Sequence, residues 1–194
     1  MSIDYYNRNA QDFIERTMDL DVSVIADRFL AYVTNGGSIL DLGCGPGRDA
    51  LYFKAKGYDV YGLDGSEALV SYAKRLLGDK ISLSTFEAYK NPICFDGIWA
   101  MASLIHVFEK DMTKMVSKYK EMLKPDGIFY MSFKKYKENF VIEDRFFTCY
   151  EIDSLEAMIK EVKGLDIIEL FESSSIKEGH EEEKWVNVLC KRIR

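Results

Sequence analysis

The sequence contains few of the residues that bind metals. Among its 194 residues there are two histidines and four cysteines, and no two cysteines form a C-x-x-C pair. Zinc sites are built from closely spaced cysteine and histidine ligands, so we expect no metal. Because an unpaired cysteine packs as a small apolar residue, Cys94 and Cys190 are expected to be buried thiols.

The sequence also has no long apolar run. Its longest mostly apolar stretch, residues 98–108, contains Ser103 and His106 and is far shorter than the ~20 residues that span a bilayer. The first residues lack the basic region and apolar core of a secretory signal. We therefore expect a cytoplasmic protein without a membrane partner.

Basic residues are outnumbered by acidic ones. The chain has 26 Lys and Arg against 32 Asp and Glu, a net charge of -6. Proteins that bind nucleic acids usually present a basic field, so this balance argues against a nucleic-acid partner. The length and the 47% of hydrophobic residues fit one domain, 1–194, with its own core, acting as a monomer or homodimer.

One glycine-rich segment joins a predicted strand to a predicted helix. Residues 38–53 read S-I-L-D-L-G-C-G-P-G-R-D-A-L-Y-F, so a short apolar run is followed by a turn with glycine at every second position: Gly43, Gly45 and Gly47. Glycine has no Cβ, and such a turn lets a ligand lie against backbone amides. The alternative is a tight turn that binds nothing.

A second acidic residue follows the next predicted strand. Residues 58–63 are expected to be that strand, and they lead into Asp64-Gly65-Ser66, with Ser66 placed to cap a helix. Asp64 lies 21 residues after Gly43, the spacing at which a carboxylate can accept both hydrogen bonds of a ribose diol. The simpler alternative is an acid that only caps its own helix.

Strands and helices alternate along the rest of the chain. Residues 1–8 are expected to be irregular, Thr148-x-x-Glu151 has the form of a capping box, and further strands are predicted at 81–85, 95–102, 128–133, 165–171 and 185–190. This alternation predicts an α/β fold with a mostly parallel sheet and helices on both faces. Ligands of such sheets bind at the carboxyl ends of the strands, where six positions fall: Asp41, Gly43, Asp64, Glu87, Ala102 and Ser132.

The glycine turn suits S-adenosylmethionine (SAM) better than a dinucleotide. The dinucleotide pattern G-x-G-x-x-G requires glycine or alanine at position 48, where this chain has Arg48. SAM has no pyrophosphate but carries an ammonium, a carboxylate and a sulfonium. Asp41 can neutralise the cationic end, directly or through water, and loop amides or Arg48 can meet the carboxylate.

From about residue 37 to residue 133, the sequence resembles the class I SAM-dependent methyltransferases. The motifs ILDLGCGPG, VYGLDGS, TFEAY, FDGIWAMASLIHV and LKPDGIFYMSF occur in the order of that family. YYNRNAQDF, ASLIHV, SFK, RFFTCY and WVN are similar to bacterial small-molecule methyltransferases of the tellurite-resistance type. The resemblance implies a Rossmann-like, seven-stranded sheet of order 3-2-1-4-5-7-6, with the last strand antiparallel to the rest.

The resemblance also implies where the residues meet SAM and its product, S-adenosylhomocysteine (SAH). It places Gly43 and Gly45 at the methionine part, Asp64 at the ribose, and Phe86 with Glu87 beside the adenine. Residues 101–106 would border the methyl donor. The complete expected set is Asp41, Gly43, Cys44, Gly45, Arg48, Asp64, Gly65, Ser66, Phe86, Glu87, Met101 and Ala102.

The acceptor side of the site is less well marked. An acceptor that carries a proton needs a base, and His106 is the only histidine near the predicted site, although it could simply orient the following loop. Residues 1–36 are expected to form a helical segment over the cofactor edge. The expected substrate contacts are Tyr5, Arg16, Lys134 and Arg145, the last two suited to an anionic acceptor.

Three functions follow from this sequence. The first is a SAM-dependent methyltransferase for a small molecule; the second is a SAM-binding sensor or partner subunit without turnover; the third is a protein or nucleic-acid methyltransferase. A complete pocket favours catalysis. No N/D-P-P-Y/F sequence follows the fourth predicted strand, where residues 100–103 read A-M-A-S, and this argues against amino methylation of DNA.

Overall fold

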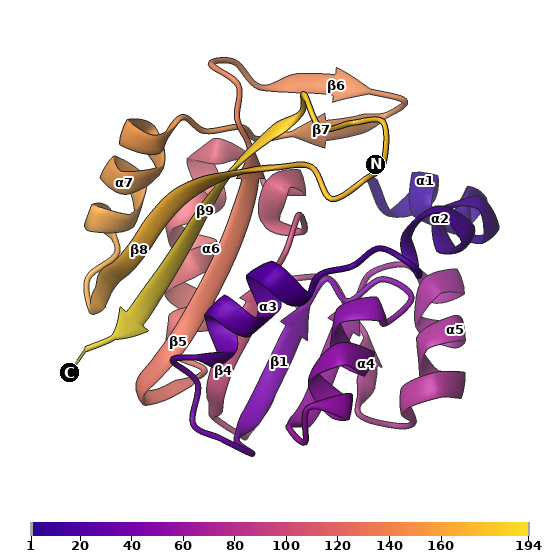
Figure 1. The fold of residues 1–194 in the computed structure, drawn as a ribbon, viewed down its shortest axis with the longest axis horizontal. Coiled ribbons are helices and arrows are strands. Elements are labelled where there is room, and N and C mark those ends of the chain that lie inside the picture. The colour runs from indigo at the N-terminus through magenta and orange to yellow at the C-terminus, as the bar shows by residue number, and fades with distance from the viewer. Residues whose placement is uncertain (1, 194) are drawn as a thin grey trace.

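The computed structural model describes residues 2–193 and is built on one large sheet (Figure 1). Seven strands lie in the order β3-β2-β1-β4-β5-β9-β8. The first five are parallel, and β9 runs antiparallel to both of its neighbours. The strands are β1 (Ser38–Leu42), β2 (Asp59–Asp64), β3 (Ile81–Leu83), β4 (Phe95–Ala100), β5 (Leu123–Lys134), β8 (Leu165–Ser174) and β9 (Lys184–Arg192). The expected fold class and strand order are therefore confirmed.

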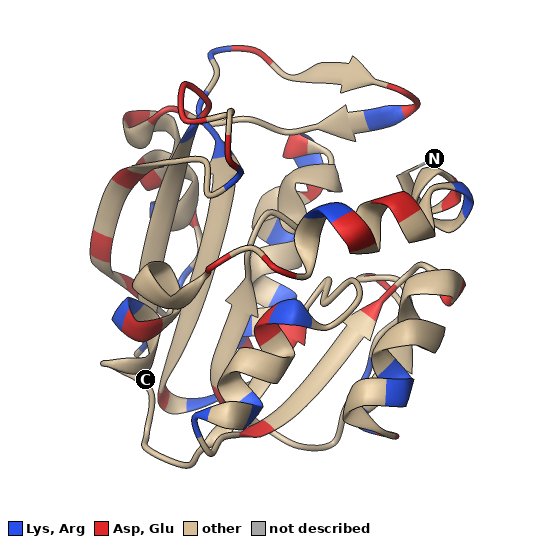
Figure 2. Ribbon diagram, turned by 45° about the vertical axis from the view of Figure 1, so that its right-hand side comes forward, with Lys and Arg blue, Asp and Glu red and all other residues tan. Residues whose placement is uncertain are grey.

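Helices cover both faces of this sheet because its central strands are apolar on both sides, and Figure 2 shows few charged residues along these central strands. In β1, Ile39 faces one core cluster while Leu40 and Leu42 face the other. Three helices lie on the first face: α3 (Ser23–Leu30), α4 (Arg48–Ala55) and α5 (Glu67–Leu77). Two lie on the second: α6 (Glu109–Lys120) and α7 (Ile152–Glu161). None of the helices within residues 2–193 is both long and apolar enough to cross a bilayer.

Aromatic side chains fill the core between the first face of the sheet and helices α3 and α4. The rings of Phe29 from α3 and Phe53 from α4 each lie 5.2 Å from the ring of Trp99 in β4. Trp99 in turn stacks on Tyr130 of β5, with 4.0 Å between the ring centroids. All four side chains are fully buried, so α3 and α4 are fixed against the centre of the sheet.

Two small units lie above the carboxyl ends of the parallel strands (Figure 1). One is formed by α1 (Ser2–Arg8) and α2 (Ala10–Thr17), and the other is a hairpin of β6 (Phe140–Ile142) and β7 (Arg145–Phe147). A 3-10 helix, η1 (Leu104–His106), follows β4 beneath them. These units come from distant parts of the chain and surround the edge where the sequence places the site.

The prediction that residues 1–8 are irregular was wrong, since Ser2–Arg8 form α1. Packing stabilises this short helix: the Tyr5 side chain is buried, and the Asn9 amide donates to the Tyr5 carbonyl at 2.9 Å. Neither interaction produces a periodic apolar pattern in the sequence, so the sequence alone did not predict this helix.

Two local predictions also differ from the structure. The capping box of α7 uses Glu151 and Ser154 rather than Thr148 and Glu151, because the Thr148 hydroxyl is buried and donates to the Val107 carbonyl at 2.6 Å. Cys190 is buried as expected, but Cys94 is exposed in the loop before β4.

Candidate functional site

The glycine turn after β1 is tied to the end of β2. The amides of Gly43 and Cys44 both donate to the Leu63 carbonyl, at 2.8 and 2.9 Å. Gly43, Gly45 and Gly47 have φ values of 78°, 53° and 96°, a left-handed region that other residues enter only with strain. The turn therefore requires glycine at each of these positions.

Cys44 contributes only its backbone to this turn. Its side chain is buried in a small cluster with Val70, Ala73 and Ile81, and burial raises the pKa of its thiol well above the usual value. A protonated thiol that packs beneath α5 is structural, and the Cys44 amide already donates to the Leu63 carbonyl. Cys44 therefore shapes the turn and offers neither group to a ligand.

The Asp64 carboxylate is fixed by two backbone amides. One oxygen accepts from the Gly45 amide at 2.9 Å, and the other accepts from the Ser66 amide at 2.8 Å. Burial raises the pKa of Asp64, and the amide hydrogen bonds oppose that rise. The Ser66 hydroxyl caps α5 by accepting from the Leu69 amide at 3.3 Å, as the sequence predicts.

Two buried polar atoms beside the glycine turn have no protein partner. Asp41 is 3% exposed, yet one of its carboxylate oxygens has no hydrogen bond within residues 2–193, and the same holds for the hydroxyl of Ser103. Burial and the neighbouring carboxylate of Asp49 raise the pKa of Asp41 well above normal. Buried polar groups nearly always have partners, so these two atoms fit a ligand that carries a cationic, hydrogen-bonding group.

The Arg48 side chain turns toward its neighbour in sequence. Its Nε lies 2.5 Å from an Asp49 carboxylate oxygen, and the other oxygen of Asp49 accepts from the indole of Trp99 at 2.7 Å. The Arg48 side chain is 19% exposed and borders a cavity of about 70 Å³. That cavity is lined by Ile25, Arg48, Met101, Ala102, Ser132, residues 173–176, Trp185 and Asn187.

The backbone is strained just after β4. Ala102 has a φ of 51°, which costs an alanine about 1–2 kcal/mol. Its amide donates to the Ser132 hydroxyl at 2.9 Å, so the ends of β4 and β5 are joined at this point. Met101 and Ala102 therefore border the cavity in a fixed conformation.

The two residues expected beside the adenine differ in exposure. The Phe86 ring contacts the turn, because a Cβ built on Gly43 would lie 3.3 Å from it. The Phe86 carbonyl accepts from Lys118 at 2.6 Å and from the Tyr119 hydroxyl at 2.9 Å. Glu87 is exposed. The structure thus brings Phe86, but not the Glu87 side chain, against the glycine turn.

His106 is held by both of the units above the sheet edge. Its Nδ1 lies 2.8 Å from the Phe146 carbonyl in β7, and its Nε2 lies 2.9 Å from the Tyr6 hydroxyl in α1. Because a carbonyl can only accept, Nδ1 carries the proton and Nε2 accepts from Tyr6. Burial lowers the pKa of His106 to about 4, so the ring is neutral at pH 7.

The first helix also contacts the residues after β2. The Asn7 side-chain carbonyl accepts from the Ser66 hydroxyl at 2.8 Å and from the Ala68 amide at 3.2 Å. A Cβ on Gly65 would lie 2.7 Å from the side chain of Ile3. A larger residue at position 65 would therefore displace the Ile3 side chain, and Gly65 allows α1 to lie close to this edge.

The four expected substrate contacts separate into two groups. The Arg145 guanidinium lies 3.8 Å from the ring centroid of Tyr5, and Lys134 lies on the same side of the molecule, 5.8 Å from the ring of Phe147. Arg16 is more than half exposed and pairs with Asp12 at 2.6 Å on α2. Tyr5, Lys134 and Arg145 thus adjoin the site, whereas Arg16 faces solvent.

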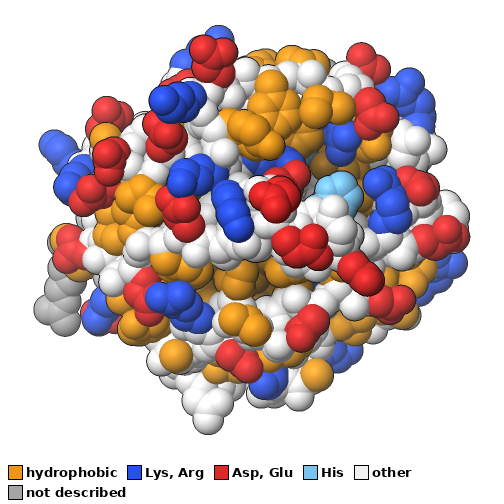
Figure 3. All heavy atoms as spheres, turned by 45° about the horizontal axis from the view of Figure 1, so that its top comes forward, with side chains coloured by type: hydrophobic (Ala, Val, Ile, Leu, Met, Phe, Trp, Pro, Cys, Tyr) orange, Lys and Arg blue, Asp and Glu red, His pale blue; other side chains and the backbone are white. Residues whose placement is uncertain are grey.

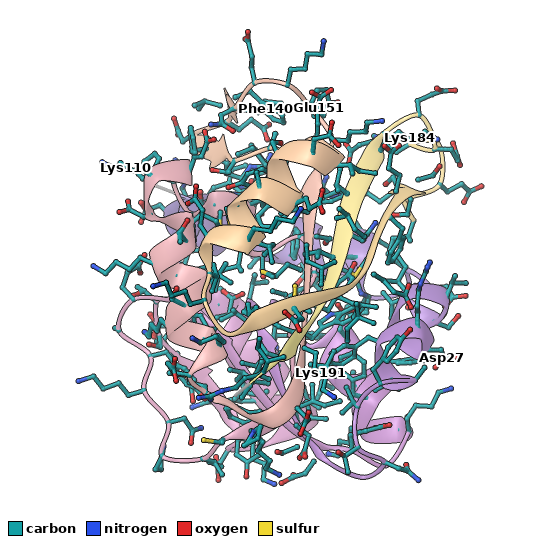
Figure 4. All side chains as sticks on the ribbon, turned by 90° about the vertical axis from the view of Figure 1, so that its left-hand side faces the viewer. Asp27, Lys110, Phe140, Glu151, Lys184 and Lys191 are labelled. Carbon is teal, nitrogen blue, oxygen red and sulfur yellow. The ribbon has the colours of Figure 1, made fainter. Side chains whose placement is uncertain are left out.

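Several residues of this edge were not singled out from the sequence. Asn7 and Asp49 contact it through the bonds described above, Ser103 lies against Gly43, and Phe147 lies 5.0 Å from the His106 ring. Figure 4 places Phe140, Glu151 and Lys184 at the same end of the molecule, so the hairpin, the start of α7 and the start of β9 all border it. Figure 3 looks onto this end, where hydrophobic side chains gather beside basic and acidic ones.

Comparison with known proteins agrees with this geometry. Residues 39–127 match the family model described as "Methyltransferase domain". These residues form a methyltransferase domain. A curated relative, the methyltransferase GfsG of Streptomyces halstedii, is 31% identical over 104 residues, which are 49% of this chain and 37% of GfsG. The chain thus matches little more than a third of the length of that relative.

Solved structures share the fold of this methyltransferase domain. The 1,6-didemethyltoxoflavin-N1-methyltransferase of Burkholderia thailandensis, with bound 1,6-didemethyltoxoflavin and SAH, is 16% identical, with a TM-score of 0.77 over 100% of this chain and 86% of that one. The magnesium protoporphyrin IX methyltransferase of Synechocystis PCC 6803, with bound SAM, is 17% identical, with a TM-score of 0.74 over 98% and 95%. The narrower likeness to the tellurite-resistance type stays a prediction.

Proposed function

We propose that this protein transfers the methyl group of SAM to a small-molecule acceptor. The observation that carries the proposal is the pair of acids on either side of the glycine turn, the buried Asp41 and the half-buried Asp64. The unpartnered oxygen of Asp41 suits the ammonium of SAM, and Asp64 suits its ribose diol. Phe86 would pack beside the adenine, and the Arg48 guanidinium would meet the carboxylate, since the amides of Gly43, Cys44, Gly45 and Gly47 already donate within the protein.

SAM supplies an electrophilic methyl group on its sulfonium sulfur, and SAH is the leaving group. An in-line displacement of this kind requires alignment of the acceptor and exclusion of water. The strained Ala102 and the following Ser103 fix the wall beside the glycine turn, and α1 with the hairpin covers that wall. His106, neutral at pH 7, keeps an unprotonated Nε2 and can take a proton from an acceptor that displaces the Tyr6 hydroxyl.

The cover over the site supports a small acceptor. Arg8 of α1 lies 3.4 Å from Asp144 at the tip of the hairpin, and Arg145 stacks on Tyr5 nearby. These contacts join the two units above the sheet edge, and such a cover favours a small acceptor over a polypeptide or duplex. Tyr5, Lys134 and Arg145 are proposed as acceptor contacts, with Arg16 as an outer one.

The decisive experiment measures SAM and SAH binding by calorimetry and then methyl transfer. In Asp64→Asn the affinity for SAM is expected to fall about 10- to 100-fold, because a charged hydrogen bond contributes ~1.5–3 kcal/mol. Asp59→Asn is the matched control, since Asp59 begins the same strand and pairs with Lys80 at its other end. Equal affinities in both variants would refute the ribose assignment.

Transfer is then measured with labelled SAM against a panel of metabolites, thiols and oxyanions. A labelled product supports catalysis and identifies the acceptor. Binding of SAM without any labelled product would favour the alternative, a SAM-binding sensor or partner subunit.

A further inference from the structure

The Phe147 ring is the centre of an aromatic cluster on the acceptor side. Phe147 is 5% exposed and lies at the end of β7. The His106 ring meets it edge-on at 5.0 Å, and the Phe140 ring stacks on it at 4.9 Å. This cluster forms an apolar layer under the hairpin, and its half-buried members, Phe140 and Phe146, reach the surface.

Two cations flank the same ring. The Arg145 guanidinium lies 5.3 Å from the Phe147 ring centroid, and the Lys134 ammonium lies 5.8 Å from it. Their side chains are only 17% and 16% exposed. Charged side chains are seldom buried to this extent without full compensation, and the net charge of -6 gives the chain no general surplus of cations.

Lys134 is compensated by a carboxylate, whereas the compensation of Arg145 is incomplete. Lys134 pairs with Glu183 at 2.5 Å. Arg145 pairs at 2.9 Å with Glu143, whose side chain is 61% exposed, and the buried Nε of Arg145 has no hydrogen-bond partner in the described part of the chain. Since buried donors are nearly always satisfied, Arg145 retains a donor for a ligand.

Both cations lie close to the wall that borders the methyl donor. Lys134 is two residues beyond Ser132, whose hydroxyl holds the Ala102 amide. Arg145 precedes Phe146, whose carbonyl holds His106. A ligand anchored by these cations would therefore reach toward Tyr6, His106 and the glycine turn.

We infer that the acceptor is a small organic anion. Its carboxylate, or an equivalent anionic group, lies between Arg145 and Lys134, and its apolar body packs on the half-buried edge of the aromatic cluster at Phe140. Arginine offers carboxylates a rigid fork of donors, and an aromatic surface gains most from an organic body. This inference rests on the proposed function, since it describes the acceptor of that same methyl transfer.

The test uses the full chain saturated with SAH and measures binding of benzoate, phenylacetate and hexanoate by calorimetry. Their neutral amides serve as ligand controls, and phosphate and selenite serve as inorganic anions. Each carboxylate is expected to bind at least tenfold more tightly than its amide. Arg145→Gln and Lys134→Gln are each expected to weaken carboxylate binding at least tenfold, while Arg145→Lys keeps part of it.

Lys160→Gln is the matched control, because Lys160 also pairs with a glutamate, Glu156, but is 66% exposed on α7. SAH affinity is measured in every sample, so failure to bind SAH would refute the proposed function instead. With SAH bound, the inference is wrong if carboxylates do not bind, if they bind no better than amides, or if both glutamine variants bind them normally. Tighter binding of phosphate or selenite than of any carboxylate would also overturn it.

Discussion

Replacing Gly43 with alanine tests how closely the glycine turn packs against the segment after β4. A Cβ at position 43 would lie 2.4 Å from the Cβ of Ser103, where non-bonded carbons normally approach to about 3.5–4.0 Å. Gly57 offers a matched control, because its φ of 89° is close to the 78° of Gly43 and nothing lies within 4 Å of its added Cβ. The two substitutions thus share backbone strain and differ in the clash.

The expected magnitudes follow from these two contributions. Left-handed backbone costs an alanine about 1–2 kcal/mol, which is the whole expected loss of stability in Gly57→Ala. Overpacking adds about 1–3 kcal/mol, so Gly43→Ala is expected to lose ~2–5 kcal/mol. The double variant Gly43→Ala/Ser103→Gly removes the clashing side chain. It should therefore be more stable than the sum of the two single losses of stability predicts.

The assay is urea unfolding at pH 7, together with SAM affinity by calorimetry. Gly43→Ala should unfold at lower urea than Gly57→Ala and should bind SAM more weakly, whereas Gly57→Ala should bind SAM like the unchanged protein. If the two variants lose equal stability, the turn is not packed against Ser103 as described, and the reasoning fails.

Two further outcomes concern the histidine beneath the cover. The folded state keeps the pKa of His106 at about 4 while the unfolded value is near 6.5, so the unfolded chain binds the extra proton and stability is lost as pH falls below 6.5. Urea unfolding should show a loss of ~2 kcal/mol in stability between pH 7 and pH 5. The loss should vanish in His106→Gln but persist in the control His180→Gln, because His180 lies on an exposed loop. A pH dependence that is unchanged in His106→Gln would contradict this prediction. Tyr6→Phe removes the 2.9 Å hydrogen bond to His106 and should lower the free energy of unfolding by ~1 kcal/mol. NMR titration of His106 in this variant tests whether the pair exists, and an unaltered titration would mean that it does not.

The central sheet was predictable because each strand and helix has its own periodic pattern. Helix α1 was missed because its stability comes from tertiary contacts, such as Asn7 on Ser66. The hairpin was missed because its strands have three residues each and its turn uses Glu143 and Asp144, with φ values of 50° and 65°, where asparagine and glycine would have signalled it.

The part of the site that lies at the ends of the parallel strands could be predicted from the sequence. Asp41 and Asp64 follow apolar runs, so their place at one edge follows from the parallel order of the strands. The direction of a side chain does not follow in the same way. Arg48 pairs with Asp49 and Glu87 is exposed, and both outcomes depend on neighbours that only the folded chain brings together.

The two amide bonds of Asp64 have a consequence for ligand affinity. They join the turn after β1 to the start of α5, and they restrict the carboxylate to one orientation within the folded chain. A diol that binds there finds its acceptor already oriented, so little side-chain entropy remains to be lost on binding. Preorganisation of this kind makes part of the affinity a property of the backbone around Asp64, which an asparagine at the same position would disturb as well.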